Sequence, residues 1–529
     1  MKQQIYEFLK KLYPKAGFDT SYPPEGFGDY STNIAFLLAK EKGENPQKIA
    51  EETTGKLKDK FADEFEKIEI AKNGFINFHL SRDYLLKQLG EFLKSKIKFP
   101  KTEKQKINLE FVSANPTGPL TLGNARSAAY GDTLANILGK AGHKVIREYF
   151  INDIGTQVEL LSESIKRRLQ QLEGENVDFP EELYQGGYII DLAKKAKENK
   201  IPTERIKDFA IQKNLGEIRE SLAKFGVKFD VWFKESSLSE SDEVKSALTH
   251  LEHSNLTYKK EGAVWFKGRD SGLDKDVALV RSEKAGKAAG AGTYLLSDFA
   301  YAKNKLNRDF DLNIYILGAD HYDDSKRLKA GIKALNLPEE KFIILIHQLV
   351  ALKRGDEILR MAKRKGIYVT LDDLLEQIPK DVARYFFLEK SLDTHLEFDL
   401  ELAKEESNKN PVYYIQYAFA RINSVFGKAG SIKIASDLKL LNGKEELDLI
   451  RYLIRFPEII FDISQNYQVH HLAQYAYELA NRFHKFYETQ RIISDDRDLT
   501  EVRLALITAV KNVLGETLTL MGLESPKRM

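Results

Sequence analysis

The 529-residue sequence contains no cysteine, and this absence removes several kinds of chemistry at once. Without thiols the chain cannot form disulfides, bind a metal through thiolates or use a cysteine nucleophile. It also lacks an uninterrupted run of about 18 apolar residues, the length that a membrane-spanning helix needs. Residues 1–14 have the spacing of an amphipathic helix and do not resemble a signal peptide. These features predict a cytoplasmic protein without a membrane partner.

An excess of one sign of charge is missing too, since 81 Lys and Arg residues face 79 Asp and Glu residues. A near-neutral chain that binds nucleic acid must gather its basic residues locally. The sequence shows no internal repeat and no low-complexity tract. Its length predicts several domains, each with a buried core.

The clearest chemical signal lies in residues 107–153, where a strand, a loop, a helix and a second strand are predicted in that order. Apolar residues alternate over 107–111, a loop rich in Pro and Gly follows, and helical apolar spacing leads to a further apolar run at 145–151. This order is typical of the first crossover in a parallel nucleotide-binding sheet. Free amides and the positive end of the helix dipole converge at such a loop, which predicts a phosphate site.

The loop sequence ANPTGPLTLGNARSA (114–128) resembles the first nucleotide-binding motif of class I aminoacyl-tRNA synthetases, and specifically of the arginyl-tRNA synthetases. That family has the pattern A-N-P-T-G-P-L-H-x-G-H-x-R-x-A. Thr121 and Asn124 therefore stand where the family has histidines. Seven further segments resemble family motifs in the family's order: PEGFGDYSTNIA (24–35), GFINF (74–78), TYLLSDFAY (293–301), GADH (318–321), RMAKRKG (360–366), NPVYYIQYAFAR (410–421) and SPKRM (525–529).

The resemblance implies a multidomain α/β fold with three parts. A small α/β domain at 1–95 would contact the tRNA elbow. A Rossmann-like parallel-sheet catalytic domain would follow at 105–380, with an insertion at about 155–290. An all-α anticodon-binding bundle would complete the chain at 381–529.

Residue patterns along the chain agree with this division. Strand signals fade after about residue 380, and helical periodicity then dominates apart from a loop-like break at 428–437. Earlier in the chain, helices are predicted at 5–12, 33–42, 46–61 and 80–93, and strands at 74–78, 312–317 and 342–350.

The resemblance also implies a reaction, the ligation of L-arginine to its cognate tRNA through an arginyl-adenylate, with ATP and Mg²⁺ and with no metal bound by the protein itself. The family favours a monomer. Adenylate formation requires that ATP and a carboxylate be oriented and that charge on the phosphates be neutralised. Two segments suit this task, the amide-rich loop 119–126 and the basic segment 353–365.

By family match the ATP-binding residues are Pro119, Gly123, Arg126, Met361 and Lys363, and the catalytic residues are Lys363, Thr121 and Asn124. A basic cluster on its own is more often a solvated surface, so the assignment of Lys363 depends on the resemblance.

The two replaced histidines leave two hypotheses open. Threonine and asparagine donate hydrogen bonds but cannot become cationic. Loss of a charge-assisted bond costs about 1.5–3 kcal/mol, or roughly ten- to more than a hundredfold in rate. The chain is then either a working enzyme with an altered loop or a paralogue that binds tRNA without activating an amino acid. A nucleotidyltransferase would leave both terminal domains without a role. The intact amino-acid pocket favours the working enzyme.

Arginine recognition needs acceptors arranged for a planar guanidinium with five donors. Tyr294 and Asp298 lie four residues apart on a predicted helix and so share one face, although such a pair is more often a surface feature. The resemblance assigns both to the arginine side chain and makes Glu110 and Asn115 further substrate contacts. His321 follows a predicted strand at the edge where parallel sheets collect ligands, although a lone histidine is more often a core residue.

Candidate tRNA contacts occur at both ends of the chain. Tyr414, Tyr417 and Arg421 follow one another at spacings of three and four, which places them on one helix face. Such a stripe can stack unpaired anticodon bases and hold phosphates, although it more often belongs to a core. Phe75 and Asn77 match the family's contact to an extruded base of the tRNA D-loop.

Overall fold

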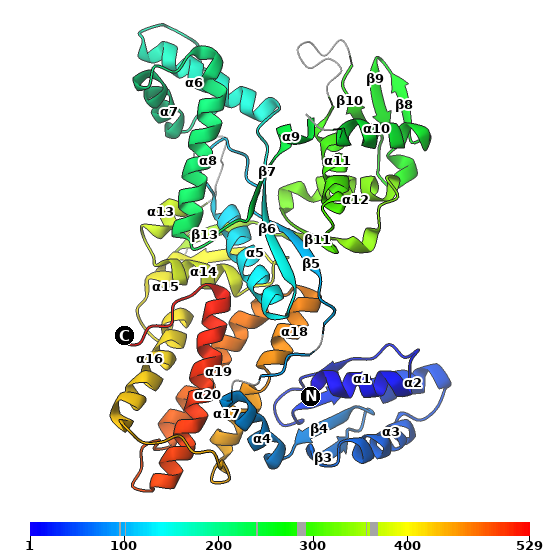
Figure 1. The fold of residues 1–529 in the computed structure, drawn as a ribbon, viewed down its shortest axis with the longest axis vertical. Coiled ribbons are helices and arrows are strands. Elements are labelled where there is room, and N and C mark those ends of the chain that lie inside the picture. Colours follow the sequence, from blue (N-terminus) through cyan, green and yellow to red (C-terminus); the bar gives the residue numbers. More distant parts are fainter. Residues whose placement is uncertain (95–96, 101, 240–241, 283–291, 356, 360–368) are drawn as a thin grey trace.

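The computed structural model describes the whole chain except residues 95–96, 101, 240–241, 283–291, 356 and 360–368. A parallel sheet occupies the centre of the molecule (Figure 1). Two insertions extend above this sheet in that view, and the N-terminal domain and a helical bundle lie below it.

The N-terminal domain is a four-stranded antiparallel sheet in the order β1-β2-β4-β3, packed against helices. Its helix α3 begins where the side chain of Asn45 accepts a hydrogen bond from the amide of Gln47, with Pro46 in the first turn. The predicted helices of this domain are confirmed. Its elements are α1 (Lys2–Leu12), β1 (Thr20–Ser21), β2 (Tyr30–Thr32), α2 (Ile34–Lys42), α3 (Pro46–Lys60), β3 (Phe65–Ile70), β4 (Ile76–Leu80) and α4 (Arg82–Leu93).

The central sheet has five parallel strands in the order β12-β11-β5-β6-β7. The helix α5 (Leu122–Lys140) follows β5 and packs closely against Phe111, the residue directly after that strand. A Cβ on Gly131 of the helix would lie only 2.3 Å from the Cγ of Phe111. The predicted strand–loop–helix–strand order at 107–153 is confirmed. The strands are β5 (Lys106–Glu110), β6 (Lys144–Ile151), β7 (Val231–Lys234), β11 (Leu312–Gly318) and β12 (Phe342–His347).

Strand β7 falls inside the stretch at about 155–290 that was expected to be one insertion. It pairs with β6, and Trp232 stacks on Tyr149 with ring centroids 4.4 Å apart. The stretch therefore holds a strand of the main sheet between two separate insertions. The helical one comprises α6 (Thr156–Leu172), α7 (Gly187–Glu198) and α8 (Ile206–Lys224). The other comprises α9 (Glu235–Ser239), α10 (Glu243–His253), β8 (Thr257–Lys260), β9 (Ala263–Phe266) and β10 (Val277–Val280), followed by α11 (Tyr294–Asn307).

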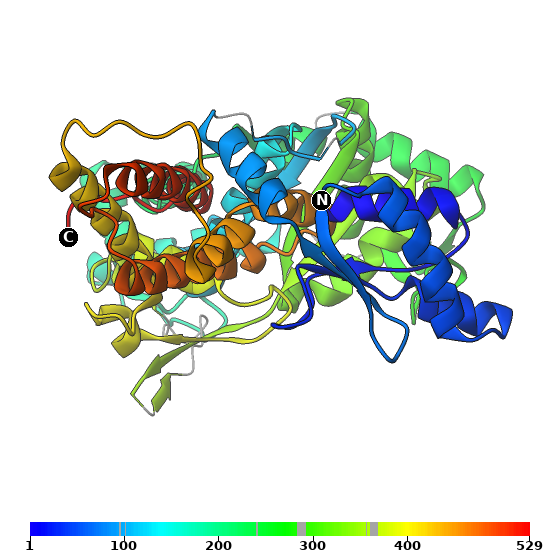
Figure 2. The ribbon, with the colours of Figure 1, turned by 90° about the horizontal axis from the view of Figure 1, so that it is seen from below.

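After β11 the chain forms α12 (Tyr322–Ala334), and after β12 it forms a second small sheet in the order β14-β13-β15. Figure 2 shows the hairpin of β13 and β14 extending away from the body of the molecule. Strand β15 was not expected after residue 380, because its four residues bury only Leu396 and Phe398 and give too short an alternation to detect. The elements here are β13 (Val350–Arg354), β14 (Glu357–Leu359), α13 (Leu371–Leu375), α14 (Lys380–Leu388), β15 (Leu396–Asp399) and α15 (Leu400–Lys404).

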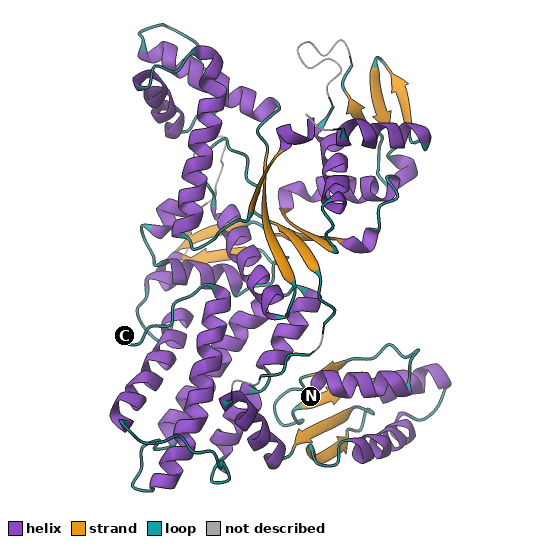
Figure 3. Ribbon diagram, in the orientation of Figure 1, coloured by secondary structure: helices purple, strands orange, loops and turns teal. Residues whose placement is uncertain are grey.

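The remainder of the described chain is a helical bundle (Figure 3). Its last helix is long and apolar enough to cross a membrane by length and composition, but 67% of that apolar stretch is buried within the protein. It therefore forms the core of the bundle. The helices are α16 (Pro411–Ala429), α17 (Lys444–Leu453), α18 (Phe456–Asn466), α19 (His470–Thr489) and α20 (Arg497–Met521), and the gap between α16 and α17 covers the predicted break.

Two buried ion pairs join the domains. Glu458 of α18 accepts hydrogen bonds from the amino terminus of Met1 at 2.7 Å and from the hydroxyl of Tyr22 at 2.8 Å. Arg384 of α14 donates to the carboxylate of Asp132 in α5 at 2.7 Å and to the carbonyl of Met521 in α20 at 2.8 Å. In both arrangements the buried charge has several hydrogen-bond partners. A buried charge needs such partners because it has lost its contact with water.

Candidate active site

The predicted phosphate loop ends at Thr121, the residue that caps α5. The Thr121 hydroxyl accepts from the amide of Asn124 at 3.5 Å, and the Asn124 side-chain oxygen accepts from the amide of Thr121 at 3.0 Å. This reciprocal pair is a capping box. The first amides of a helix have no partner within the helix, so those of Leu122 and Gly123 remain at the opening turn with the positive end of the dipole. The two residues that replace the family histidines therefore hold the loop in shape.

The other predicted ATP-binding residues lie in different surroundings. Pro119 and Gly123 are partly exposed beside the start of α5. Met361 and Lys363 lie outside the described residues. Arg126 is completely buried, and its guanidinium donates to the carbonyls of Gln348, Ser391 and Thr394 at 3.1, 2.8 and 2.8 Å. Both Nη atoms therefore fix the chain after β12, and an ATP contact by Arg126 stays a prediction.

A histidine that the sequence reasoning missed lies near the start of α5. His347 ends β12 and pairs in register with Gly318 of β11. A Cβ on Gly318 would lie 3.5 Å from His347 Nε2, and a Cβ on Gly123 would lie 3.9 Å from its Cε1. Burial, with a smaller contribution from the charge of Arg126, lowers the pKa of His347 to about 4. The sequence predicted one strand over 342–350, whereas the structure ends β12 at His347, so nothing in the sequence indicated that this histidine lies at a strand end. We call Leu122, Gly123 and His347 the phosphate end of the site.

Glu110 at the end of β5 is buried and has partners on both oxygens. Lys305 of α11 donates to Oε2 at 2.6 Å, and the hydroxyl of Ser113 donates to Oε1 at 3.2 Å. The sequence did not reveal Lys305 as this partner. An arginine contact by Glu110 therefore stays a prediction, to be made beside an existing ion pair.

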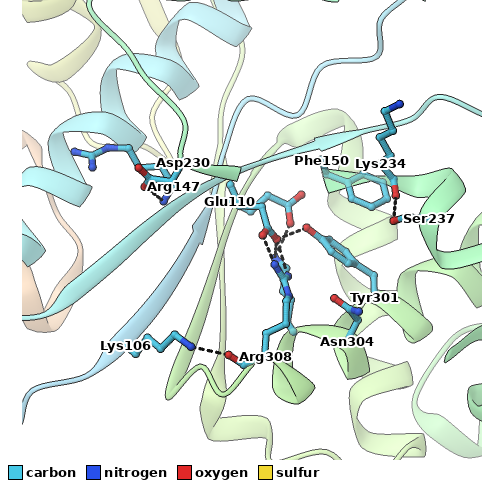
Figure 4. Close-up of polar contacts among 12 residues, drawn as sticks. Lys106, Glu110, Arg147, Phe150, Asp230, Lys234, Ser237, Tyr301, Asn304 and Arg308 are labelled. Carbon is cyan, nitrogen blue, oxygen red and sulfur yellow. Dashed lines mark hydrogen bonds and ion pairs between the residues drawn. The ribbon is translucent and has the colours of Figure 1, made fainter. Parts of the chain in front are cut away.

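A second buried carboxylate lies beside this pair. Glu148 of β6 accepts from the hydroxyl of Tyr301 and from the guanidinium of Arg308, whose Nη2 lies 2.9 Å from Oε1. Figure 4 shows Glu110, Tyr301 and Arg308 gathered beside the sheet. The Nζ of Lys305 is 3.9 Å from Glu148, so the lysine lies between both carboxylates. This network fastens α11, which carries the predicted arginine-binding residues, to the sheet.

Tyr294 and Asp298 lie on α11, as predicted. Tyr294 is the first residue of the helix, and its hydroxyl accepts from the amide of Thr156 at 3.0 Å. Gly155 has a φ of +93°, and a Cβ there would lie 2.1 Å from that hydroxyl, so the contact requires glycine. Burial raises the pKa of Asp298 well above its usual range, and the charge of Glu235 raises it further.

Glu235 is a second acidic residue that the sequence reasoning missed. It begins α9 directly after β7, and its side chain is only 3% exposed. Its Oε2 has no hydrogen-bond partner within the described part of the chain. Burial raises its pKa to about 7, and the nearby charge of Asp153 adds to the rise. Carboxyl groups with raised pKa values in one pocket mark a candidate binding site for a cation. We call Glu110, Glu235 and Asp298 the acidic end of the site.

His321 and Asn115 lie at the carboxyl edge of the same sheet. His321 Nδ1 is 3.1 Å from a carboxylate oxygen of Asp324, a hydrogen bond that raises the pKa of the histidine. Asn115 donates to the side-chain oxygen of Gln157 at 2.7 Å and accepts from Asn152 at 2.6 Å. His321 is therefore held by a residue of α12, and Asn115 by Gln157 of α6 and by Asn152 after β6.

The predicted anticodon stripe lies on α16 and faces α19. Arg421 donates to the hydroxyl of Tyr417 at 2.6 Å, and Tyr414 packs against His484 with ring centroids 4.5 Å apart. The guanidinium carbon of Arg421 also lies over the ring of Tyr487, 4.6 Å from the ring centroid. The stripe is partly exposed, and the aromatic residues of α19 enlarge it beyond what the spacing on one helix could show.

The N-terminal candidates differ in exposure. Phe75 is partly exposed just before β4. Asn77 is buried within β4 and accepts a hydrogen bond from the hydroxyl of Ser31 at 2.7 Å. A tRNA contact by Asn77 stays a prediction that requires its side chain to exchange this partner.

A parallel sheet with a loop and a capped helix after its first strand, buried acids near the carboxyl ends of its strands and a helical bundle after the last strand defines a class I aminoacyl-tRNA synthetase. Three family models match the chain in succession: the arginyl tRNA synthetase N terminal domain at 1–80, the class I (R) tRNA synthetase catalytic domain at 88–406 and the DALR anticodon binding domain at 415–529. The chain belongs to the arginyl-tRNA synthetase family.

Individual relatives agree with the family models. The chain is 42% identical to an arginine–tRNA ligase from Carboxydothermus hydrogenoformans over 99% of its own length and 98% of that protein. It is 40% identical to an arginine–tRNA ligase from Syntrophotalea carbinolica over 100% and 99% of the two chains. The arginyl-tRNA synthetase from Thermus thermophilus has the same fold, with a TM-score of 0.80 at 21% identity over 100% of this chain and 99% of that one.

Proposed function

We propose that this chain joins arginine to tRNA in two steps, with arginine bound at the acidic end of the site and ATP at the phosphate end. The reaction itself follows from the family: the chain is a class I arginine–tRNA ligase that uses ATP. The observation that carries the assignment of the two ends is the pair Asp298 and Glu235, two buried acids with raised pKa values, of which the charge of Glu235 acts on Asp298.

At the acidic end, the substrate guanidinium supplies the missing positive charge. Its planar fork of donors suits two carboxylates, and Tyr294 offers a hydroxyl at the rim. Arginine binding favours the ionised acids and thus lowers the pKa values of Asp298 and Glu235. Asn115, Glu110 and His321 lie nearer the loop and hold the α-amino and carboxylate groups.

At the phosphate end, the amides of Leu122 and Gly123 and the dipole of α5 bind the triphosphate. The arginine carboxylate attacks the α-phosphorus, and the bond to the leaving pyrophosphate breaks. Lys363, assigned by its family position, neutralises the charge that develops on the leaving group. A hydroxyl of the terminal tRNA ribose then attacks the adenylate carbonyl and AMP leaves.

Mg²⁺ enters with ATP as the counter-ion of the triphosphate. Among the described residues no group of three histidine or acidic side chains could hold a metal ion. The ion supplies positive charge to the phosphates, and Thr121 and Asn124 orient the loop around them.

The terminal regions bind the tRNA. Residues 1–95 contact its elbow through Phe75 and Asn77, the catalytic domain spans 105–380, and residues 381–529 hold the anticodon. The partly exposed stripe of Tyr414, Tyr417 and Arg421 supports the last assignment, since aromatic rings beside an arginine suit stacked bases and their phosphates. The protein acts as a monomer in the cytoplasm.

Arginine-dependent exchange of pyrophosphate into ATP, measured with and without the arginine-accepting tRNA, tests the proposal. A working enzyme gives exchange that requires arginine, and by family resemblance also tRNA. The alternative of an inactive tRNA-binding paralogue predicts tRNA binding without exchange. The relatives' names give that alternative no support.

A further inference from the structure

The phosphate end needs positive charge that its own loop does not carry. Thr121 and Asn124 are committed to each other in the capping box, and neither can become cationic. Arg126, the one cation of the loop, is buried with both Nη atoms donating to three carbonyls. A group beside the opening turn of α5 that can gain a proton would supply the positive charge that the loop lacks.

His347 is such a group. Its imidazole lies between Gly318 at the end of β11 and Gly123 in the first turn of α5, at 3.5 and 3.9 Å from the Cβ positions that these glycines lack. A side chain at either position would contact the ring. The two glycines thus leave the imidazole open to the place where a phosphate would bind.

The ring also has a defined orientation. Nδ1 lies 3.4 Å from the carbonyl oxygen of Gln348, so Nδ1 carries the proton in the neutral form and donates to that carbonyl. Nε2 then presents a lone pair toward Gly318. Arg126 holds the same carbonyl at 3.1 Å and so keeps this acceptor in place.

We propose that His347 is a further ATP-binding residue, which takes up a proton when ATP arrives and donates a charged hydrogen bond from Nε2 to a phosphate oxygen. The inference rests on the proposed placing of ATP at the opening turn of α5. The imidazolium would then replace, from a strand on the other side of the loop, the positive charge that Thr121 and Asn124 do not provide.

The groups around His347 set its response to pH. Burial and the charges of Arg126 and His321 lower its pKa, while Asp320 and the Gln348 carbonyl raise it, with the result near 4. The ring is therefore neutral at pH 6 before ATP binds. A phosphate oxygen at Nε2 favours the charged form and raises the pKa, so ATP binding at pH 6 draws a proton from solution.

Calorimetric titration of Mg·ATP into the full chain with its tRNA, in two buffers of different ionisation enthalpy, tests this inference. At pH 6 the parent is expected to take up a larger fraction of a proton than His347→Ala. The Ala variant should bind ATP about tenfold more weakly or worse, the scale of a charged hydrogen bond. Arginine affinity should stay the same, which also shows that the variant is folded.

Two further variants sharpen the result. His347→Gln keeps a neutral donor near Nε2, so it should lose the extra proton uptake but only part of the affinity. His253→Ala, on the exposed end of α10, is the matched control and should behave like the parent. When Thr121 and Asn124 are both replaced by histidine, His347→Ala should cause a smaller loss of ATP affinity than it does in the parent.

ATP affinity or proton uptake in either His347 variant equal to that of the parent would overturn the inference. Pyrophosphate exchange by the parent is measured separately. Exchange in the parent together with unchanged ATP binding in the variants would reject only His347, whereas no exchange in the parent would reject the proposed function.

Discussion

The acidic end and the phosphate end of the site are built in opposite ways. The acidic end gathers buried acids before its substrate arrives: Lys305 fixes the carboxylate of Glu110, and burial raises the pKa values of Asp298 and Glu235. The phosphate end is shaped by neutral groups: the capping pair of Thr121 and Asn124, the backbone amides and an imidazole.

The difference suits the ligand proposed for each end. A guanidinium keeps its charge at every pH of interest, so its pocket can hold a fixed surplus of acid. A triphosphate brings its own counter-ion, and Lys363 as proposed adds a fixed positive charge at the leaving group, so the loop itself can use neutral donors. Neutral donors that gain charge only during binding suit that end better.

The largest effect should come from breaking the support of the acidic end. Lys305→Met leaves the buried carboxylate of Glu110 without its cation, which costs about 3–5 kcal/mol of unfolding free energy. Denaturant unfolding measures this loss. Lys303→Met, on a more exposed position of the same helix, should cost far less, and adding Glu110→Gln to Lys305→Met should recover much of the stability. A double variant as unstable as the single one would contradict the pairing.

Substrate affinity is the next test of the comparison. Asp298→Asn keeps the shape of the side chain but removes its charge, so arginine should bind about 1.5–3 kcal/mol more weakly. ATP binding should not change, because it uses the other end. Calorimetry measures both. Asp323→Asn on the exposed surface of α12 is the control and should alter neither affinity. Unchanged arginine binding in the Asp298 variant would mean that the pocket is wrongly placed.

Glu235 should show how much unfolding free energy is lost when a buried carboxylate ionises without a cation beside it. Its folded-state pKa of about 7 lies above the ordinary 4.5, so stability from the protonated form is present below pH 4.5 and lost as the pH rises through 7. Glu235→Gln should therefore raise the unfolding free energy by about 1–3 kcal/mol at pH 8 and by little near pH 4. Thermal unfolding across this range measures the gap, with exposed Glu252→Gln as control. A stability difference between Glu235→Gln and the parent that does not depend on pH would exclude titration of Glu235 as its cause.

The smallest effect is expected at the phosphate end. Thr121→His/Asn124→His removes the capping box, which should cost about 0.5–2 kcal/mol of stability. Pyrophosphate exchange should stay the same or rise, because the new histidines can donate charged hydrogen bonds. Thr121→Ala loses the cap without that gain and separates the two effects. Lower exchange in the histidine variant than in Thr121→Ala would show that the present loop is better adapted than the family's.

Much of this arrangement could be predicted from local patterns. The strand at 107–111 and the helix after the loop follow from apolar spacing, and a helix was also predicted to carry Tyr294 and Asp298; the structure confirms all three. Thr121 and Asn124 were recognised as unusual, but their bond to each other depends on the cap geometry.

The residues that escaped prediction share one property: their role depends on partners distant in sequence. Lys305 looks like any helical lysine until Glu110, 195 residues earlier, lies against it. Glu235 acquires its raised pKa from burial beside Asp153, and His347 acquires its place from two glycines on other elements. Arg126 was assigned to ATP because its motif was recognised, whereas its burial depends on carbonyls more than 200 residues away.

The buried Arg384 has partners that are synthesised at very different times. Its guanidinium reaches back to Asp132 in α5 and forward to the carbonyl of Met521, and a Cβ on Gly522 would lie only 2.5 Å from it. On the ribosome, Asp132 of α5 is made nearly 400 residues before Met521, the last partner of this buried charge, emerges. The nucleotide-binding half should therefore stay protease-sensitive in nascent chains that end before α20. An unfinished polypeptide would then hold no finished site with which to consume ATP.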